Sequence, residues 1–124
     1  MTTLLYVEDN EDNIYMLSNR LLREGFDVSI ARTGAEGVAM ARDELPDLVI
    51  MDLVLPEMDG FEAARQLRSE SLTSHIPIIA LSASVLPEHK HRAIDAGCDD
   101  FETKPVDFPC LLGKIRRLLP AQES

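Results

Sequence analysis

Short apolar runs alternate with segments of helical periodicity from one end of the chain to the other. The runs predicted to be strands are TLLYVED at 3–9, DVSIA at 27–31, DLVIMD at 47–52, IPIIALS at 76–82 and DDFETK at 99–104. The second run alternates Val28 and Ile30 inward, as an edge strand does, and the last run is short and polar.

A segment with apolar residues at helical spacing follows each of these strands. The five predicted helices are a first segment with Ile14, Leu17, Leu21 and Leu22 that Gly25 stops, GAEGVAMARDEL between a Thr33 N-cap and Pro46, DGFEAARQLRSE with Phe61, Ala64 and Leu67, PEHKHRAIDAG from Pro87 to Gly97, and a last segment with Phe108, Leu111, Leu112, Ile115, Leu118 and Leu119 on one stripe. The helix from Pro87 has the thinnest apolar stripe, so we expect it to be the least firmly anchored.

Strands buried on both faces, each followed by a helix, indicate a parallel sheet covered on two sides. The predicted fold is a doubly wound α/β domain with a five-stranded parallel sheet and five helices. The chain has 124 residues, which fits one domain at 1–124, with 45% apolar and 27% charged residues. Only PAQES follows Leu119, so we expect a stand-alone domain that has no output domain and acts through partners.

Charge and cysteine content exclude several function classes. The net charge of -10 would repel a phosphate backbone, which disfavours direct nucleic-acid binding. No apolar run approaches the roughly 20 residues that span a bilayer, and the N-terminus has no basic segment, so we expect no membrane insertion and a cytoplasmic protein. Cys98 and Cys110 lack metal-site spacing, and we expect two buried or half-buried free thiols.

Asp52 is a carboxylate inside the most apolar run of the chain, LVIMDLVLPEMDG. An isolated buried charge costs several kcal/mol, so we expect the strand to end there and a cation to meet Asp52. The residues at the predicted strand ends are Glu8 and Asp9 for the first strand, Asp52 for the third, Ser82 for the fourth and Lys104 for the fifth. In an open parallel sheet these ends meet at one edge, where ligands bind.

Three carboxylates at one edge would repel one another unless a cation lies among them. Magnesium fits, because it takes oxygen ligands and bridges carboxylates to phosphoryl groups. Lys104 and Ser82 could then bind phosphoryl oxygens, which leaves Asp52 as the nucleophile of a phosphoryl transfer.

Each of these features also has a purely structural explanation. The segment EDNED could be only a capped helix start, and Asp52 could be a turn residue in LPEMDG. Ser82 and Lys104 are, taken singly, common loop residues. No thiol or carboxylate lies at ligand spacing from the three histidines, which we expect to face solvent: His75, His89 and His91. The constellation as a whole is far harder to explain by chance than any one member.

YVEDNEDN, PDLVIMDLVLPEMDG, IPIIALSAS and AGCDDFETKPVD resemble, in order and spacing, the receiver domain of two-component response regulators. The resemblance covers essentially the whole chain. It implies the flavodoxin-like strand order 2-1-3-4-5 of the chemotaxis regulator. It also implies a signalling switch that accepts a phosphoryl group on Asp52 from a sensor histidine kinase or a histidine phosphotransfer protein, and that signals through an unknown protein target.

The resemblance assigns a role to each motif residue. It implies that Asp9, Asp52 and the backbone carbonyl of Val54 bind Mg²⁺, with Glu8 acting through water. Ser82 and Lys104 match the phosphoryl-binding hydroxyl and lysine, and Ser82 and Phe101 match the pair that switches. It also implies a cis peptide bond between Lys104 and Pro105, the residue type for which a cis bond costs least.

Two positions depart from the usual family pattern. Glu8 stands where Asp is commoner, and Phe101 replaces a frequent Tyr. On phosphorylation we expect Ser82 to move toward the phosphoryl group and Phe101 to rotate into the space that it leaves. Because Phe lacks a hydroxyl group, this gives a population shift between two states, and the segment 83–104 should respond most.

Two other functions remain open. An aspartyl-phosphate phosphatase of the haloacid dehalogenase type would need a second Asp two residues after the nucleophile, but position 54 is Val. A degenerate receiver would be only an interaction surface, although all of its chemical positions are filled here. Apart from its own phosphorylation and dephosphorylation, we expect no enzymatic activity.

Overall fold

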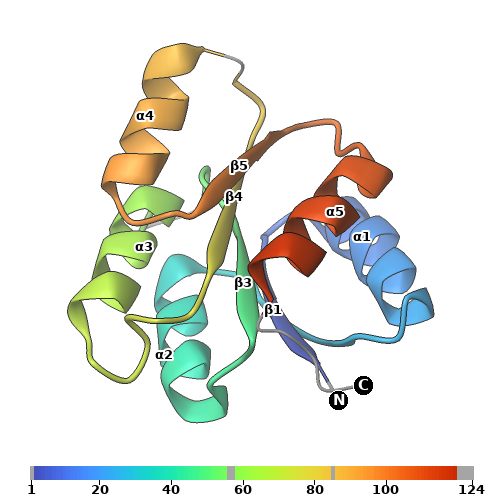
Figure 1. Cartoon of the computed structure of the whole chain (residues 1–124), viewed down its shortest axis with the longest axis horizontal. Helices are drawn as coiled ribbons and strands as arrows, with labels where there is room; N and C mark the ends of the chain where they lie inside the picture. The colour runs from blue at the N-terminus through green and yellow to red at the C-terminus, as the bar shows by residue number, and fades with distance from the viewer. Residues whose placement is uncertain (1, 56–57, 85, 120–124) are drawn as a thin grey trace.

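The protein folds as a parallel five-stranded sheet between two layers of helices (Figure 1). This computed structural model describes residues 2–55, 58–84 and 86–119; the predicted tail PAQES lies outside that range. The strands are β1 (Thr3–Val7), β2 (Asp27–Ala31), β3 (Leu48–Asp52), β4 (Ile78–Ser82) and β5 (Asp100–Thr103). Their order is β2-β1-β3-β4-β5, so the predicted flavodoxin-like topology is confirmed, with β2 at one edge.

The five predicted helices are all present. They are α1 (Glu11–Arg23), α2 (Gly34–Glu44), α3 (Gly60–Ser69), α4 (Pro87–Asp95) and α5 (Phe108–Leu118). Four of them begin at a side chain that accepts a hydrogen bond from the first turn: Asn10, Thr33, Asp59 and Asp107. The predicted N-cap Thr33 is therefore confirmed. The predicted second helix is one residue too long, because Leu45 is its left-handed C-cap, with φ 49°.

Two apolar clusters fill the space between the sheet and its helices. On one face α1 and α5 cover the sheet, with Leu17, Leu21, Leu111 and Ile115 buried. On the other face α2, α3 and α4 cover it, and Phe61, Ala64 and Leu67 of α3 are buried there. Figure 1 shows this division, with α1 and α5 on one side of the strands and α2, α3 and α4 on the other.

Burial along the helices differs from the predicted stripes at a few positions. Leu22 is 50% exposed, because it lies beside the buried Leu21 but outside the stripe that faces the sheet. The helix from Pro87 contains one buried residue, Ala93, which confirms its thin apolar stripe. Cys98 is buried as expected, but Cys110 is exposed, since it lies in the first turn of α5 on the side away from the sheet.

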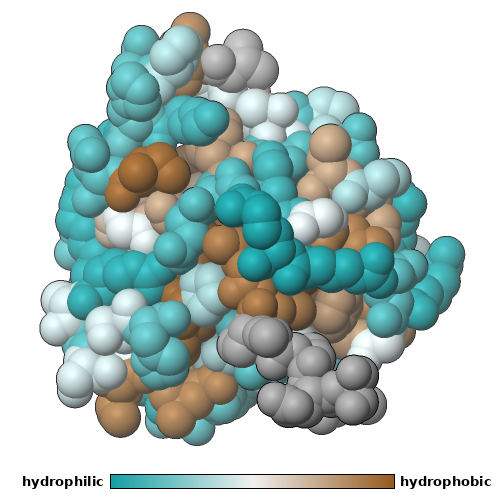
Figure 2. Space-filling view, in the orientation of Figure 1, coloured by the Kyte–Doolittle hydropathy of each residue, from teal (hydrophilic) through white to brown (hydrophobic). Residues whose placement is uncertain are grey.

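The visible surface is mostly hydrophilic, with small, separated apolar patches (Figure 2). This agrees with a chain whose apolar residues are concentrated in the two buried clusters. Among the described residues, no helix is both long and apolar enough to cross a membrane.

Candidate functional site

Strand register brings the predicted site residues to one edge of the sheet. Val7 pairs with Met51, and Asp52 pairs with Leu81, so β1, β3 and β4 end at nearly the same level. Glu8 and Asp9 follow β1 directly, and Lys104 follows β5. All the strands are parallel, so these side chains share the carboxyl edge, where an open α/β sheet binds ligands.

The loop after β3 folds back closely beneath Asp52. The backbone N–H of Gly60 donates to the carbonyl of Leu53 at 3.1 Å, and the N–H of Val54 donates to Oδ1 of Asp52 at 2.9 Å. A Cβ atom at Gly60 would lie only 2.3 Å from the backbone oxygen of Asp52. Glycine at position 60 therefore allows the start of α3 to approach the end of β3, while the Val54 N–H holds the Asp52 side chain.

Glu8, Asp9 and Asp52 form a compact acidic cluster. One carboxylate oxygen of each lies within 4.8 Å of the others. Glu8 is 1% exposed and Asp52 is 4% exposed, whereas Asp9 is exposed. Two buried carboxylates and one accessible carboxylate therefore face the same point, which is open to solvent on the side of Asp9.

Lys104 supplies positive charge to this cluster. Its Nζ atom donates to Oδ2 of Asp52 at 2.7 Å and to Oε1 of Glu8 at 3.0 Å. The Lys104–Pro105 peptide bond is cis. Lys104 thus bridges the two buried acids from a loop that lies 96 residues beyond Glu8 in the sequence.

Burial and charge shift the pKa values of all three groups. Burial, together with the neighbouring Glu8, raises the pKa of Asp52 to about 6, although Lys104 and the Val54 N–H act in the opposite direction. Burial also acts to raise the pKa of Glu8, but contacts with Asp52, Lys104 and the Asn10 N–H hold it below its usual value. Burial acts to lower the pKa of Lys104, and its two carboxylate partners hold it above its usual value.

Three more groups contact Glu8, and sequence reasoning missed them. The Tyr6 hydroxyl donates to Oε1 at 3.2 Å, the Asn13 side-chain amide donates to the same atom at 3.3 Å, and the Asn10 N–H donates to Oε2 at 3.3 Å. One signal for Tyr6 was available, because it precedes Glu8 by two residues along an extended segment, and such residues point to the same side. Asn13 lies in the first turn of α1 and gave no such signal.

The remaining predicted residues lie around the cluster in different ways. Ser82 is buried at the end of β4, where its hydroxyl accepts from the N–H of Ser84 at 3.0 Å. Val54 contacts Asp52 through its N–H, and the residue is 74% exposed. Phe101 is 8% exposed and belongs to the apolar cluster beneath α3 and α4.

The donor set fits magnesium. Carboxylate oxygens are the ligands that this hard cation prefers, and the exposed Asp9 gives the site a side that is open to water. A cation would also offset the burial and the proximity of Glu8, which together raise the pKa of Asp52.

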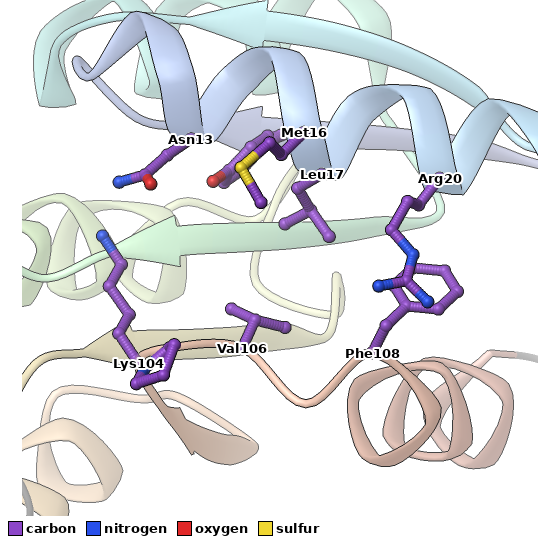
Figure 3. Close-up of a pocket in the computed structure, with 9 residues that line it drawn as sticks. Asn13, Met16, Leu17, Arg20, Lys104, Val106 and Phe108 are labelled. Carbon is purple, nitrogen blue, oxygen red and sulfur yellow. The ribbon is translucent and has the colours of Figure 1, made fainter.

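An apolar groove of about 160 Å³ begins at Lys104 and runs between α1 and the loop before α5. Met16, Leu17, Val106 and Phe108 line it. Figure 3 shows Asn13 and Lys104 pointing toward one another at one end, and Arg20 over the ring of Phe108 at the other. The Arg20 guanidinium carbon lies 4.3 Å from the ring centroid, within the range of a cation–π contact.

Comparison with known proteins agrees with this geometry. Residues 4–116 match the family described as response regulator receiver domain. Protein PilH of Pseudomonas aeruginosa is 40% identical over 96% of this chain and 98% of its own length. Response regulator PleD of Caulobacter vibrioides is 36% identical over 93% of this chain, which spans only 25% of PleD.

Solved structures show the same likeness. Chemotaxis protein CheY4 of Vibrio cholerae has a TM-score of 0.90 and 31% identity, over 96% of this chain and 99% of that one. The receiver domain of a Pseudomonas aeruginosa sensor histidine kinase was solved with magnesium coordinated in its active-site cleft. It has a TM-score of 0.88 and 31% identity, over 94% of this chain and 96% of that one. The receiver domain of Ssk1 from Saccharomyces cerevisiae, solved with the phosphotransfer protein Ypd1, has a TM-score of 0.88 and 32% identity, over 94% of this chain and 88% of that one.

The strand order, the acid cluster at the strand ends and the match over residues 4–116 all lead to one assignment. This chain belongs to the response-regulator receiver family, the signalling domains of two-component systems.

Proposed function

We propose that this chain is a phosphorylation-dependent switch, in which Asp52 accepts a phosphoryl group from the phosphohistidine of a sensor kinase or a phosphotransfer protein. The observation that carries the proposal is the placement of Asp52. It is nearly buried at the end of β3, 2.7 Å from the Lys104 ammonium, and clustered with Glu8 and Asp9. A nucleophile, a counter-charge and a cation site within one small volume are what phosphoryl transfer requires.

Asp9, Asp52 and the Val54 carbonyl would hold Mg²⁺ directly, and Glu8 would hold it through water. The bound ion would neutralise charge on the phosphoryl oxygens and on the clustered acids. The structurally similar receiver domain that was solved with magnesium in its active-site cleft supports this assignment.

In the transfer step, a carboxylate oxygen of Asp52 forms the new bond to phosphorus. The P–N bond of the donor imidazole breaks, and its electron pair stays on the imidazole nitrogen. The Val54 N–H and Lys104 orient the two Asp52 oxygens before the reaction. Lys104 then turns from Asp52 to a phosphoryl oxygen, and the Ser82 hydroxyl, at the end of the neighbouring strand, binds another.

The groove beside Lys104 is our candidate site for the phosphodonor protein. Its exposed Met16 and its lining residues Leu17 and Val106 offer an apolar strip that leads to the acid cluster (Figure 3). A helix that carries the donor histidine could pack there through its apolar side chains. The complex of a related receiver with a histidine phosphotransfer protein supports a partner of this kind.

We propose that the phosphorylated form signals through a protein target rather than through nucleic acid, since the net charge is -10. Ser82 and Phe101 are the proposed switch residues. A cytoplasmic location would keep both thiols, Cys98 and Cys110, free as they are in the structure. The phosphatase alternative is weaker, because the residue two positions after Asp52 is the exposed, apolar Val54.

Intact-mass analysis after incubation with magnesium and a small phosphodonor tests the assignment. We expect one phosphoryl adduct on the native protein and none on Asp52→Asn. Asp47→Asn is a matched control on the same strand run, since Asp47 caps the opposite end of the sheet by accepting from the Thr3 N–H at 2.8 Å. A stable adduct on Asp52→Asn would show that another residue is the acceptor, and an unmodified native protein would favour the degenerate receiver.

A further inference from the structure

Glu8 is a buried carboxylate that several donors hold in one position. Its Oε1 atom accepts from Lys104 at 3.0 Å, from Tyr6 at 3.2 Å and from Asn13 at 3.3 Å. Its Oε2 atom accepts from the Asn10 N–H at 3.3 Å. Lys104 is shared with Asp52, so the other three contacts are the ones that Glu8 alone receives from these groups.

Tyr6 is the most deeply buried of these donors. It lies on β1 with 1% of its surface exposed, and its ring belongs to the apolar cluster under α1 and α5. Its hydroxyl reaches out of that cluster to Glu8. A phenol that is buried to this extent loses its water, and a hydrogen bond to a charged acceptor compensates strongly for that loss.

Glu8 needs positioning more than an aspartate would. Its side chain has one more rotatable bond, so its carboxylate can reach more positions within the site. Lys104 alone cannot fix it, because Lys104 also binds Asp52 and is the residue expected to turn toward a phosphoryl group. Tyr6 and Asn13 contact Glu8 from β1 and α1, and neither contact depends on Lys104.

We propose that Tyr6 is a positioning residue, supported by Asn13, that fixes the Glu8 carboxylate in the magnesium site while Lys104 moves between Asp52 and the phosphoryl group. The inference rests on the proposed function, because it assigns Glu8 to the metal site. It predicts that the Tyr6 hydroxyl contributes to Mg²⁺ affinity without touching the ion.

Calorimetric titration of the metal-free protein with MgCl₂ tests this inference with Tyr6→Phe. This variant removes the hydroxyl and keeps the buried ring. We expect Mg²⁺ affinity to fall by roughly 3- to 10-fold, at or below the low end of what the loss of an outer-shell partner costs. Tyr15→Phe is the matched control, since Tyr15 is the other tyrosine of the chain and is 72% exposed. The Mg²⁺ affinity of this variant should equal that of the native protein.

A double-mutant cycle with Glu8→Asp separates positioning from a general effect on the fold. An aspartate ends roughly 1.5 Å short of the Glu8 carboxylate, because it lacks one C–C bond, and cannot keep the 3.2 Å contact with Tyr6. Adding Tyr6→Phe to Glu8→Asp should therefore leave Mg²⁺ affinity within about twofold of Glu8→Asp alone.

The outcomes distinguish the inference from the proposed function. Unchanged affinity in Tyr6→Phe overturns the positioning role of Tyr6, and so does an equal loss in the native and Glu8→Asp backgrounds. If the native protein itself binds no Mg²⁺, the metal site of the proposed function fails, and the role of Tyr6 fails with it. A loss confined to the native background supports both.

Discussion

Asp52 combines two properties that oppose one another at the level of a single residue. Its burial favours the neutral acid, but only the ionised carboxylate can bind a cation or attack phosphorus. Lys104 and the Val54 N–H partly offset the burial, and its pKa still lies at about 6. Protonation of Asp52 therefore limits what the site can do at acidic pH.

The raised pKa predicts that Mg²⁺ affinity of the native protein depends on pH. Below about 6 most Asp52 side chains carry a proton that the cation must displace. The apparent affinity should therefore rise as pH increases, by up to about tenfold per pH unit below 6, and should level off above it. Calorimetric titrations with MgCl₂ between pH 5 and pH 8 would measure this pH dependence, because they cover about one unit below and two units above the pKa of Asp52. A flat profile would contradict the raised pKa.

The same raised pKa has the opposite effect on the stability of the metal-free protein, to which Asp52 contributes less as pH rises. Because the pKa is raised on folding, the stability that Asp52 contributes is fully present below its unfolded value of about 3.9 and is lost as pH rises through about 6. The free energy of unfolding of Asp52→Asn should therefore increase relative to the native protein between these two pH values. Urea denaturation of both proteins at each pH measures this difference, in which titrating groups that have no contact with Asp52 cancel.

At the scale of elements, Arg68 joins the end of α3 to the segments that precede β4 and β5. From the end of α3, its guanidinium donates to the backbone carbonyls of Gly97 at 2.7 Å and Ile76 at 2.6 Å, and pairs with Asp99. Asp99 in turn accepts from the N–H of Ile78, the first residue of β4, at 2.8 Å. One side chain thus fixes the loops on both sides of the β4–α4 unit.

Arg68→Lys should therefore lower the free energy of unfolding by about 2 kcal/mol, since a lysine cannot supply the fork of donors that reaches several acceptors at once. Arg65→Lys, on the same helix, is the matched control. Arg65 is half exposed and has one contact within the helix, to Glu62 at 3.5 Å, so a change within about 0.5 kcal/mol is expected. Urea denaturation measures both, and equal stabilities would rule out the anchoring role of Arg68.

Helix α4 is the element best placed to move when Asp52 is modified. It buries only Ala93, and Arg92 lies over the ring of Phe61 at 3.9 Å, which ties α4 to the helix that begins behind Asp52. Binding of magnesium and beryllium fluoride, as a phosphoryl mimic, should change amide hydrogen exchange mainly in residues 83–104. Helix α5, with Phe108, Leu111 and Ile115 buried, is the internal reference. Unchanged exchange in 83–104, with the partner still distinguishing the two forms, would show that the signal travels another way.

For the whole molecule, the sequence was most informative where chemistry follows directly from strand ends. Asp52 and Ser82 end apolar runs, and Lys104 follows the short, polar fifth strand, so the parallel topology alone brings them to one edge. Contacts between side chains of distant elements have no corresponding pattern in the sequence. The fork of Arg68 and the contact of Arg92 with Phe61 depend on how helices lie against one another, which periodicity does not specify.

The boundaries and exposures that sequence reasoning missed have local causes. Leu45 continues the apolar pattern of its helix, but its backbone turns left-handed before Pro46. Cys110 was expected to be at least half-buried because cysteine usually is, but its position in the first turn of α5 turns it away from the sheet. The residue type gives a preference for burial, but the face of the helix on which the residue lies determines whether it is buried.

The difference in exposure between the two cysteines should allow this protein to be labelled at a single site. Cys98 is buried, and burial raises the pKa of its thiol to about 12, whereas Cys110 is exposed at the start of α5. A maleimide dye or a nitroxide spin label should therefore attach at one place without any substitution. The native chain could report binding of its partners through a single label on α5, with Cys110→Ser as the unlabelled reference.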